Sequence, residues 1–310
     1  MLPSDPPIPA ASYHSLVTDH TQLASSVAAQ GGVVMLIGAP DTGKSTLAGE
    51  ILRQAASQGK VTAYVDADVA QSTVGPPGCV GLKWVRSIED LGTISEADAL
   101  RFVGSTNPAR LVLQMVLATA ALVEQAHASA DLVLIDTTGT VSGVVGQTLK
   151  YHKVETCHPR LVVGLQRGSE LDPIIGMLQR FFSVDVITAE EHPDLVPVSP
   201  DVRSEVRVQQ FGKALSHPLE AWRIKPTVFA PTLPTGLDLD RLAGMVVGVQ
   251  DGFGACLGLG ALEYTEGVLR VLTNHGEGMQ GLRLGSMRID LQTYETKPVN
   301  LRELMFGLAL

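Results

Sequence analysis

Four residues in the segment GAPDTGKST have the types and spacing needed to bind phosphate. Gly38, Gly43, Lys44 and Ser45 fit the pattern G-x-x-x-x-G-K-[ST]. Glycines let backbone N–H groups face phosphate oxygens, the lysine reaches the terminal phosphates, and the hydroxyl is a ligand for Mg²⁺. The pattern predicts a nucleoside triphosphate site rather than a ligand-free strand-to-helix turn. The predicted nucleotide-binding residues of this loop are Gly38, Asp41, Thr42, Gly43, Lys44, Ser45 and Thr46.

The identity of the nucleotide base is predicted from the absence of a guanine-recognition motif after a later strand. An Asn-Lys-x-Asp box that would read guanine is absent there, and VVGLQRGSEL stands in its place. This favours ATP.

Two apolar runs end in carboxylates that could complete a catalytic centre. YVDADVAQS carries Asp66, Asp68 and Gln71, and LVLIDTTG ends near Asp136. Ligands of open α/β sheets bind at the carboxyl ends of the strands, so these side chains should lie beside the phosphate loop. We expect Asp68, with Gln71, to accept a proton from an acceptor hydroxyl, and Ser45, Asp66 and Asp136 to hold Mg²⁺. The alternative for Asp136 is a turn or helix cap.

Two arginines one helical turn apart follow in VSPDVRSEVRVQQF. Arg203 and Arg207 should project from one helix face. An isolated pair of this kind is typical of a solvated surface. Beside a phosphoryl-transfer site the same pair predicts a lid that neutralises charge on the transferred phosphate.

These residues need a scaffold, and the chain alternates apolar β-branched runs with helical patterns, which predicts a parallel sheet with crossover helices. The expected fold is α/β: a P-loop NTPase with three layers and a mostly parallel sheet, followed by a small C-terminal β-rich domain. We expect a tail at 1–30, a kinase domain at 31–226 and the β-rich domain at 227–310, where Gly and Asp-Gly turns separate short apolar runs. The expected strands of the first domain are Val33–Gly38, Val61–Asp68, Asp131–Gly139 and Arg160–Gln166, with helices starting near Lys44, Pro108, Gly143 and Glu170.

Composition restricts the function classes. The chain has 310 residues, is 45% hydrophobic and carries a net charge of −9. No apolar run is long enough to cross a membrane and no secretory leader is evident, so a cytoplasmic protein with no membrane contact is expected. The negative charge argues against a broad nucleic-acid footprint, so any nucleic acid should be gripped locally. Cys79, Cys157 and Cys256 show no metal-ligand or disulfide spacing.

Taken together, the motifs resemble those of the polynucleotide 5′-hydroxyl kinases of RNA processing, which include the kinase subunit of the eukaryotic pre-mRNA cleavage complex. GAPDTGKST is similar to the family's P-loop, and DADVAQSTVGPPGC to its D-x-x-Q motif and the stretch that follows. Thr137 and Gly139 match the T-x-G-W clasp, while Arg203 and Arg207 match the R-x-x-x-R lid. The similarity runs from about Val33 to the C-terminus.

The chain departs from the family pattern at two points. Thr140 stands where the clasp has Trp, so any stacking by that aromatic is lost. The residues before Val33 are too few for the N-terminal β-domain of the eukaryotic members.

The resemblance implies an ATP- and Mg²⁺-dependent kinase that phosphorylates the 5′-hydroxyl end of RNA, or alternatively of DNA. It assigns Lys44 to the β- and γ-phosphates, Asp68 to general base catalysis, Thr137 and Gly139 to the clasp, and Arg203 and Arg207 to the lid. Two other functions stay open: a regulatory or metal-chaperone P-loop NTPase, in which LVLIDTTG senses the γ-phosphate, and a non-catalytic ATP-bound scaffold.

Overall fold

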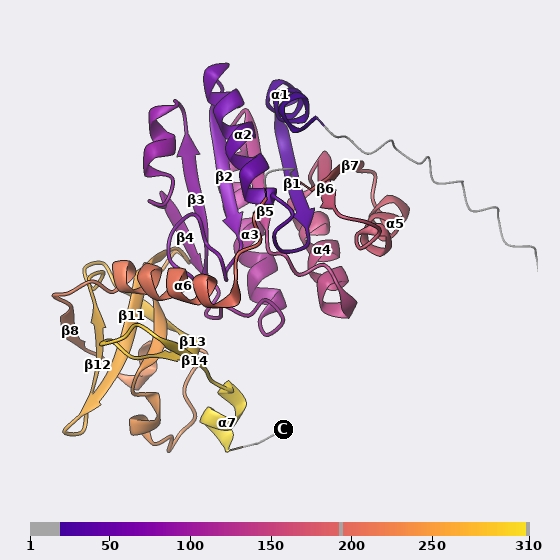
Figure 1. The fold of residues 1–310 in the computed structure, drawn as a ribbon. Coiled ribbons are helices and arrows are strands. Elements are labelled where there is room, and N and C mark those ends of the chain that lie inside the picture. Colours follow the sequence, from indigo (N-terminus) through magenta and orange to yellow (C-terminus); the bar gives the residue numbers. More distant parts are fainter. Residues whose placement is uncertain (1–18, 192–194, 308–310) are drawn as a thin grey trace, which may run out of the picture.

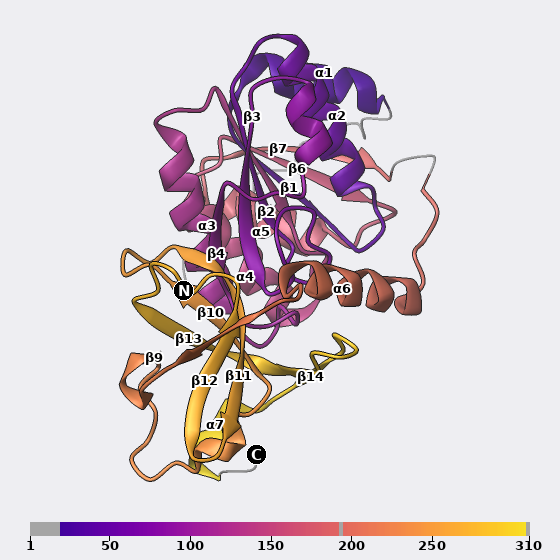
Figure 2. The same ribbon diagram turned by 90° about the vertical axis from the view of Figure 1, so that its left-hand side faces the viewer.

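The computed structural model describes residues 19–191 and 195–307, which form two seven-stranded sheets joined by a long helix. The first sheet has the order β4-β3-β2-β5-β1-β6-β7. In both Figure 1 and Figure 2, helix α6 (Pro200–Ala214) runs along the junction between this sheet and the C-terminal one. The molecule therefore brings three surfaces, two sheets and one helix, to a common boundary.

The first sheet is parallel through five strands and antiparallel at one edge, where β3 and β4 pair. Nearly every residue of β1, β2, β5 and β6 is buried, as expected for strands covered on both faces. The strands are β1 (Gly32–Gly38), β2 (Thr62–Ala67), β3 (Cys79–Val85), β4 (Ala99–Phe102), β5 (Leu132–Thr137), β6 (Leu161–Gln166) and β7 (Asp185–Glu190).

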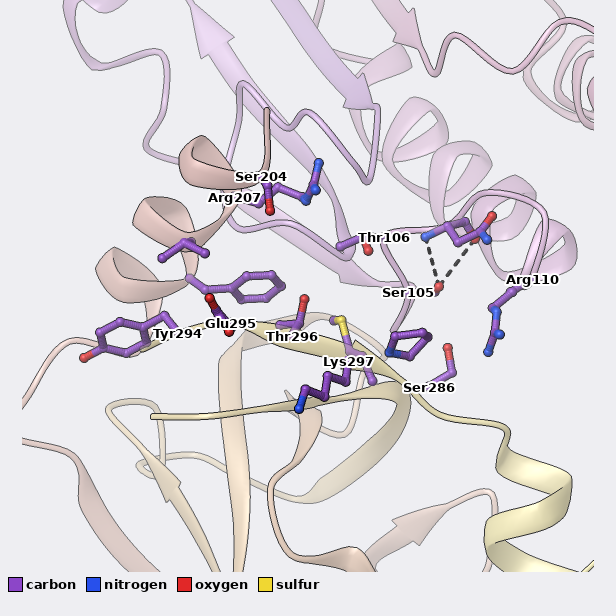
Figure 3. A pocket seen from close by; sticks show the side chains of 15 residues that line it. Ser105, Thr106, Arg110, Ser204, Arg207, Ser286, Tyr294, Glu295, Thr296 and Lys297 are labelled. Atoms are coloured by element: carbon purple, nitrogen blue, oxygen red, sulfur yellow. Dashed lines mark hydrogen bonds between the residues drawn. The ribbon is translucent and has the colours of Figure 1, made fainter. Parts of the chain in front are cut away.

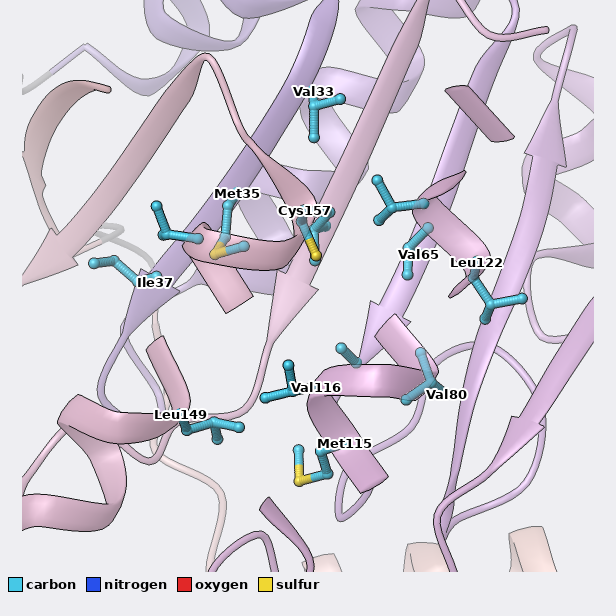
Figure 4. Packing of buried hydrophobic residues seen from close by; sticks show 14 of the residues in the cluster. Val33, Met35, Ile37, Val65, Val80, Met115, Val116, Leu122, Leu149 and Cys157 are labelled. Atoms are coloured by element: carbon cyan, nitrogen blue, oxygen red, sulfur yellow. The ribbon is translucent and has the colours of Figure 1, made fainter. Parts of the chain in front are cut away.

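Helices cover both faces of this sheet and bury its apolar side chains. One face packs against α1 and α2, the other against α3, α4 and α5. Figure 4 shows the second interface, where Val33, Met35 and Ile37 of β1 share a cluster with Leu122 of α3 and Leu149 of α4. The helices are α1 (His20–Gln30), α2 (Lys44–Ser57), α3 (Val112–His127), α4 (Gly143–Cys157) and α5 (Asp172–Phe181).

The second sheet is antiparallel apart from a short parallel pairing of β9 with β13. The β10–β11 and β11–β12 hairpins turn at Asp251–Gly254 and at Glu266–Gly267, the Gly-containing turns expected from the sequence. The elements are β8 (Glu220–Arg223), β9 (Phe229–Ala230), β10 (Met245–Gln250), β11 (Cys256–Thr265), β12 (Val268–Thr273), β13 (Gly281–Ile289), β14 (Thr296–Pro298) and α7 (Leu301–Phe306).

The expected fold class is confirmed, and the four expected strands lie within one or two residues of their predicted ends. Three strands were not foreseen: β3, β4 and β7. β4 and β7 are the edge strands and lack the continuous apolar runs of the buried ones, whereas β3 is buried at six of its seven residues but has Gly81 and Lys83 within its run. Within the expected tail, 1–18 lies outside the described residues, while α1 packs its apolar face on the sheet beside α2. The second sheet includes β8, which precedes residue 227.

Among the described residues, no helix has both the length and the apolar character needed to cross a lipid bilayer.

Candidate phosphoryl-transfer site

The phosphate loop connects β1 to α2 and is shaped by glycine at both ends. Gly43 has φ +90°, a left-handed conformation that favours glycine, and α2 begins at the next residue with no side-chain cap. A Cβ on Gly38 would lie 2.6 Å from both the Leu165 carbonyl oxygen and the Thr42 hydroxyl. Thr42 is buried and donates to the Ala39 carbonyl at 2.9 Å. The first N–H groups of α2 are therefore left uncapped beside a tightly packed loop, as an anion site requires.

Lys44 and Ser45 face the carboxylate at the end of β5. The Lys44 ammonium donates to the Ala39 carbonyl oxygen at 2.7 Å, and the Ser45 hydroxyl donates to Asp136 Oδ2 at 2.7 Å. Burial lowers the pKa of Lys44, while the nearby charges of Asp136, Asp68 and Asp41 oppose that shift. Burial raises the pKa of Asp136, opposed first by Lys44 and then by the Ser45 hydrogen bond. Lys44 and the carboxylates of Asp136, Asp68 and Asp41 thus form one electrostatic unit.

The donor set around Asp136 fits a magnesium ion. Asp136 Oδ1 is buried and has no hydrogen-bond partner among the described residues. Its other oxygen accepts from Ser45 and, at 3.3 Å, from the Tyr64 hydroxyl. Mg²⁺ is bound in nucleotide sites by one or two protein oxygens together with phosphate oxygens and waters, so one carboxylate and one hydroxyl suffice.

Asp66 was expected to join this metal site, but the structure turns it away. Its Oδ1 accepts from the Asp68 N–H at 2.9 Å, and Oδ2 accepts from the N–H groups of Thr73 and Val74. It is buried and does not line the nucleotide pocket. Burial, followed by the charge of Asp136, raises its pKa to about 8. Asp66 therefore organises the loop after β2. An aspartate at a strand end is equally consistent with metal binding, so the sequence could not tell these two roles apart.

Asp68 and Gln71 do line the pocket, as expected. Asp68 Oδ1 accepts from the N–H groups of Ala70 at 2.9 Å and Gln71 at 3.1 Å. Asp68 Oδ2 has no hydrogen bond within the described part of the chain and the residue is half-buried. One oxygen therefore orients the carboxylate while the other stays available for a proton.

The loop after β5 divides its residues between the pocket and the core. Gly139 lines the pocket, and a Cβ there would come within 2.7 Å of the Pro40 nitrogen, so a bare glycine lets this loop touch the phosphate loop. The Thr137 hydroxyl points inward instead: it donates to the Leu36 carbonyl and accepts from Lys150, each at 2.7 Å. Thr137 therefore shapes the loop from beneath. Of the two residues expected to form the clasp, Gly139 lines the pocket and Thr137 does not, while the neighbouring Thr138 and Thr140 line it as well.

Lys150 is a residue that sequence reasoning missed. It is fully buried in α4, and its ammonium donates at 2.7 Å to both the Thr137 hydroxyl and the Thr138 carbonyl. Burial lowers its pKa well below the usual range, helped by the charges of Lys153 and Lys44. The sequence shows Lys150 only as one of several basic residues in LKYHKVET, so nothing local marks it as buried.

The two arginines that were expected to form a lid line different cavities. Arg203 forms an ion pair with Asp41 of the phosphate loop and lines the nucleotide pocket. Arg207 lines a neighbouring cavity instead. Arg167 is a further arginine at this edge that was not predicted as a site residue. It follows β6 and donates to the carbonyl oxygens of Asp41 and Pro40. Arg167 stands at the C-terminal end of an apolar run, as Asp136 does, so the signal that identified Asp136 was present here too.

The nucleotide pocket has a volume of about 630 Å³, within the usual range for small-molecule sites. Its charged lining residues are Lys44 and Arg203, balanced by Asp41 and Asp68. The phosphate loop, the β2 and β5 loops and the start of α6 all contribute. Thus the pocket combines an anion cradle, a candidate base and a guanidinium.

Comparison with known proteins decides the family. Residues 38–214, more than half of the chain, match the family model described as the P-loop of the mRNA cleavage and polyadenylation factor CLP1. The chain belongs to this CLP1 P-loop family. The matched segment begins at Gly38 and ends at the last residue of α6, so it includes every predicted site residue.

Several relatives carry names that describe an activity. A polyribonucleotide 5′-hydroxyl-kinase of Thermococcus kodakarensis is 28% identical, with 87% of this chain and 92% of the relative covered. The protein of that name from Pyrococcus furiosus is 26% identical over 88% of this chain and 86% of its own length. Polyribonucleotide 5′-hydroxyl-kinase Clp1 of Rattus norvegicus is 26% identical, over 64% of this chain and 48% of the rat protein.

The fold of the CLP1 P-loop family is also found among solved structures. The structure of the Clp1p–Pcf11p complex matches with a TM-score of 0.61 and 13% identity, covering 86% of this chain and 77% of that one. At this identity the likeness concerns the fold alone. It supports the P-loop NTPase architecture with a second strand-rich sheet.

Proposed function

We propose that this protein is an ATP-dependent polynucleotide 5′-hydroxyl kinase that transfers the γ-phosphate of ATP to the 5′-hydroxyl end of RNA, with DNA as the alternative acceptor. Membership of the CLP1 P-loop family and relatives named polyribonucleotide 5′-hydroxyl-kinase support this function. The observation that carries it is the gathering of Lys44, Asp68 and Arg203 around one pocket. An NTPase needs the lysine, but a kinase also needs a base for an acceptor hydroxyl.

In this reaction the acceptor's 5′-oxygen forms a bond to the γ-phosphorus while the bond from that phosphorus to the β,γ-bridging oxygen breaks. ADP is the leaving group. The hydroxyl proton passes to the free oxygen of Asp68, which the N–H groups of Ala70 and Gln71 hold in place. Lys44 and Arg203 neutralise charge on the transferred phosphoryl group, and both side chains are tethered to the phosphate loop beforehand.

Ser45 and Asp136 would hold Mg²⁺, which supplies positive charge to the β- and γ-phosphate oxygens when bound. The Ser45–Asp136 hydrogen bond holds both groups in place. Tyr64 restrains the same carboxylate from the core side.

Acceptor-dependent transfer of labelled phosphate tests the proposal. The protein is incubated with ATP labelled at the γ-phosphate and a 5′-hydroxyl oligoribonucleotide, and label is measured on the oligonucleotide and as free phosphate. We expect label on the 5′ end, and none with a 5′-phosphorylated control. Phosphate release alone would instead support the regulatory NTPase, and neither product would support the scaffold. A matched oligodeoxyribonucleotide compares RNA with DNA.

A further inference from the structure

A second cavity, of about 430 Å³, lies where α6 meets the C-terminal sheet. Its walls come from α6, from the β4–α3 loop and from the β13–β14 region (Figure 3). Figure 3 shows Arg207 and Ser204 on the helix, Thr106 and Arg110 on the loop side, and Lys297 below. The cavity is therefore formed only when both sheets are in place.

The cavity is basic although the protein is acidic. Its charged lining residues are three cations, Arg110, Arg207 and Lys297, against one carboxylate, Glu295, in a chain of net charge −9. None of the three cations forms an ion pair with a carboxylate in residues 19–191 or 195–307. Arg110 is held by a hydrogen bond to the Val299 carbonyl at 3.2 Å. The remaining polar lining consists of hydroxyls and an amide: Ser105, Thr106, Asn107, Ser204, Ser286 and Thr296.

Unpaired cations and hydroxyl donors suit a ligand that carries several negative charges and many acceptor oxygens. A single-stranded nucleic acid has this chemistry, because each nucleotide adds a phosphate and a sugar. Two aromatic residues, Phe211 and Tyr294, also line the cavity. Phe211 is buried.

This cavity shares two walls with the nucleotide pocket. On α6, Arg203 lines the nucleotide pocket and Arg207 lines the second cavity. On the β4–α3 loop, Pro108 lines the first while Asn107 and Arg110 line the second. Four residues of helix advance about 6 Å along the axis, and phosphates of one stacked strand advance about 3.4 Å per nucleotide. Arg207 thus lies roughly one to two nucleotides farther along than Arg203.

We propose that the second cavity binds the sugar–phosphate backbone of the acceptor strand, at the nucleotides that follow the reacting 5′ end. This inference rests on the proposed kinase function. It assigns Arg207 to the acceptor rather than to the γ-phosphate. It also makes Arg110 and Lys297 binding residues for that acceptor.

The test compares acceptors of different length in variants of Lys297. The Lys297 side chain is exposed and has no ion-pair or hydrogen-bond partner among the described residues, so Lys297→Ala removes a charge without breaking a side-chain hydrogen bond or ion pair. Steady-state transfer is measured with a 5′-hydroxyl nucleoside 3′-phosphate and with tri-, tetra- and hexanucleotides of RNA. The wild type should have a lower KM for the tetranucleotide than for the nucleoside 3′-phosphate. In Lys297→Ala the KM for the tetranucleotide should rise roughly tenfold, the effect of losing one hydrogen bond to a charged group, so that this preference is lost.

Lys225→Ala is the matched control, because Lys225 is also an exposed lysine but lines neither cavity. It should keep the wild-type preference for the tetranucleotide. Extension from four to six nucleotides should add little, and the slope of log affinity against log salt should stay near about −2 for three phosphate contacts. An equal KM change for the mononucleotide and the tetranucleotide in Lys297→Ala, or no change for either, would overturn the proposal.

Binding measurements separate this inference from the kinase proposal. If wild-type protein transfers no phosphate, the kinase function fails, but fluorescence anisotropy with a labelled tetranucleotide still tests the cavity. Lys297→Glu should then weaken tetranucleotide binding and Lys225→Glu should not. A glutamate-rich peptide that competes as well as the tetranucleotide would overturn the acceptor-strand assignment in favour of an acidic protein partner.

Discussion

The two cavities on either side of α6 treat their cations differently. In the nucleotide pocket Lys44 is bonded to the Ala39 carbonyl and Arg203 is paired with Asp41. In the second cavity Arg207 and Lys297 have no ion-pair partner within the described residues. The first set is held in position before any ligand binds.

Catalytic electrostatics depends on groups already oriented toward developing charge, whereas strand binding tolerates adjustable side chains. This contrast supports the proposal that the nucleotide pocket determines the rate of transfer and the second cavity the affinity for the acceptor. Lys153 of α4 lines neither cavity, and its ammonium is buried with no hydrogen-bond partner in the described chain. We expect this cation to affect the stability of the fold rather than the reaction.

The largest effect should come from the lysine of the phosphate loop. Lys44→Ala should abolish transfer and strongly weaken ATP binding, because Arg203, the other cation of the pocket, is already paired with Asp41. Transfer is followed with γ-labelled ATP and binding by calorimetry. Wild-type transfer in this variant would mean that the loop is not the active site.

The two aspartates at the C-terminal end of β2, Asp66 and Asp68, should behave in opposite ways. Asp68→Asn keeps an oxygen for the N–H groups of Ala70 and Gln71 but cannot accept a proton. Transfer should fall by roughly 10²–10⁴-fold while ATP binding and the melting temperature stay near wild type.

Asp66→Asn is the matched comparison. Both Asp66 oxygens accept backbone N–H groups, so an amide would place a donor against a donor and lower the melting temperature.

If Asp68→Asn left transfer unchanged and Asp136→Asn alone abolished it, the regulatory NTPase function would be favoured.

The lid arginines provide the direct test of the contrast between the cavities. Arg203→Ala should lower kcat roughly 10²-fold with every acceptor, and Arg203→Lys should restore only part of it, since an ammonium lacks the planar fork of a guanidinium. Arg207→Ala should instead raise KM for oligonucleotides by roughly tenfold. Identical kinetic profiles for the two alanine variants would remove the distinction.

The smallest expected effect concerns Lys153 and stability. Burial lowers its pKa to about 8, so between about pH 8 and 10.5 the unfolded chain binds more protons than the folded one, and stability due to this group rises with pH. Below pH 8 the penalty is complete, about 3 kcal/mol. Lys153→Met should therefore raise the melting temperature at pH 7, by an amount that shrinks as the pH increases to 10.5. A constant difference across that range would contradict the shifted pKa.

Much of the site was predictable because its signals are local. The spacing of Gly38, Gly43 and Lys44, together with the acids at the ends of two buried strands, identifies the edge of the sheet that binds the nucleotide, without reference to the rest of the chain. Lys150 shows the limit of such reasoning. From the sequence alone, a lysine in a helix is expected to be exposed to solvent. Only the packing of α4 beneath the loop after β5 shows that Lys150 is buried there.

The sequence by itself determined the P-loop α/β architecture, the resemblance to polynucleotide kinases and the candidate base Asp68, because each follows from residue type and short-range spacing. Only the tertiary structure decided that Asp66 turns back onto its own loop and that Arg203 and Arg207 enter different cavities. It also brought Arg110 to the same cavity as Lys297, which lies 187 positions later in the chain. The physical reason is that a side chain's partner depends on which distant element packs against its face, and one turn of α6 is enough to change that element.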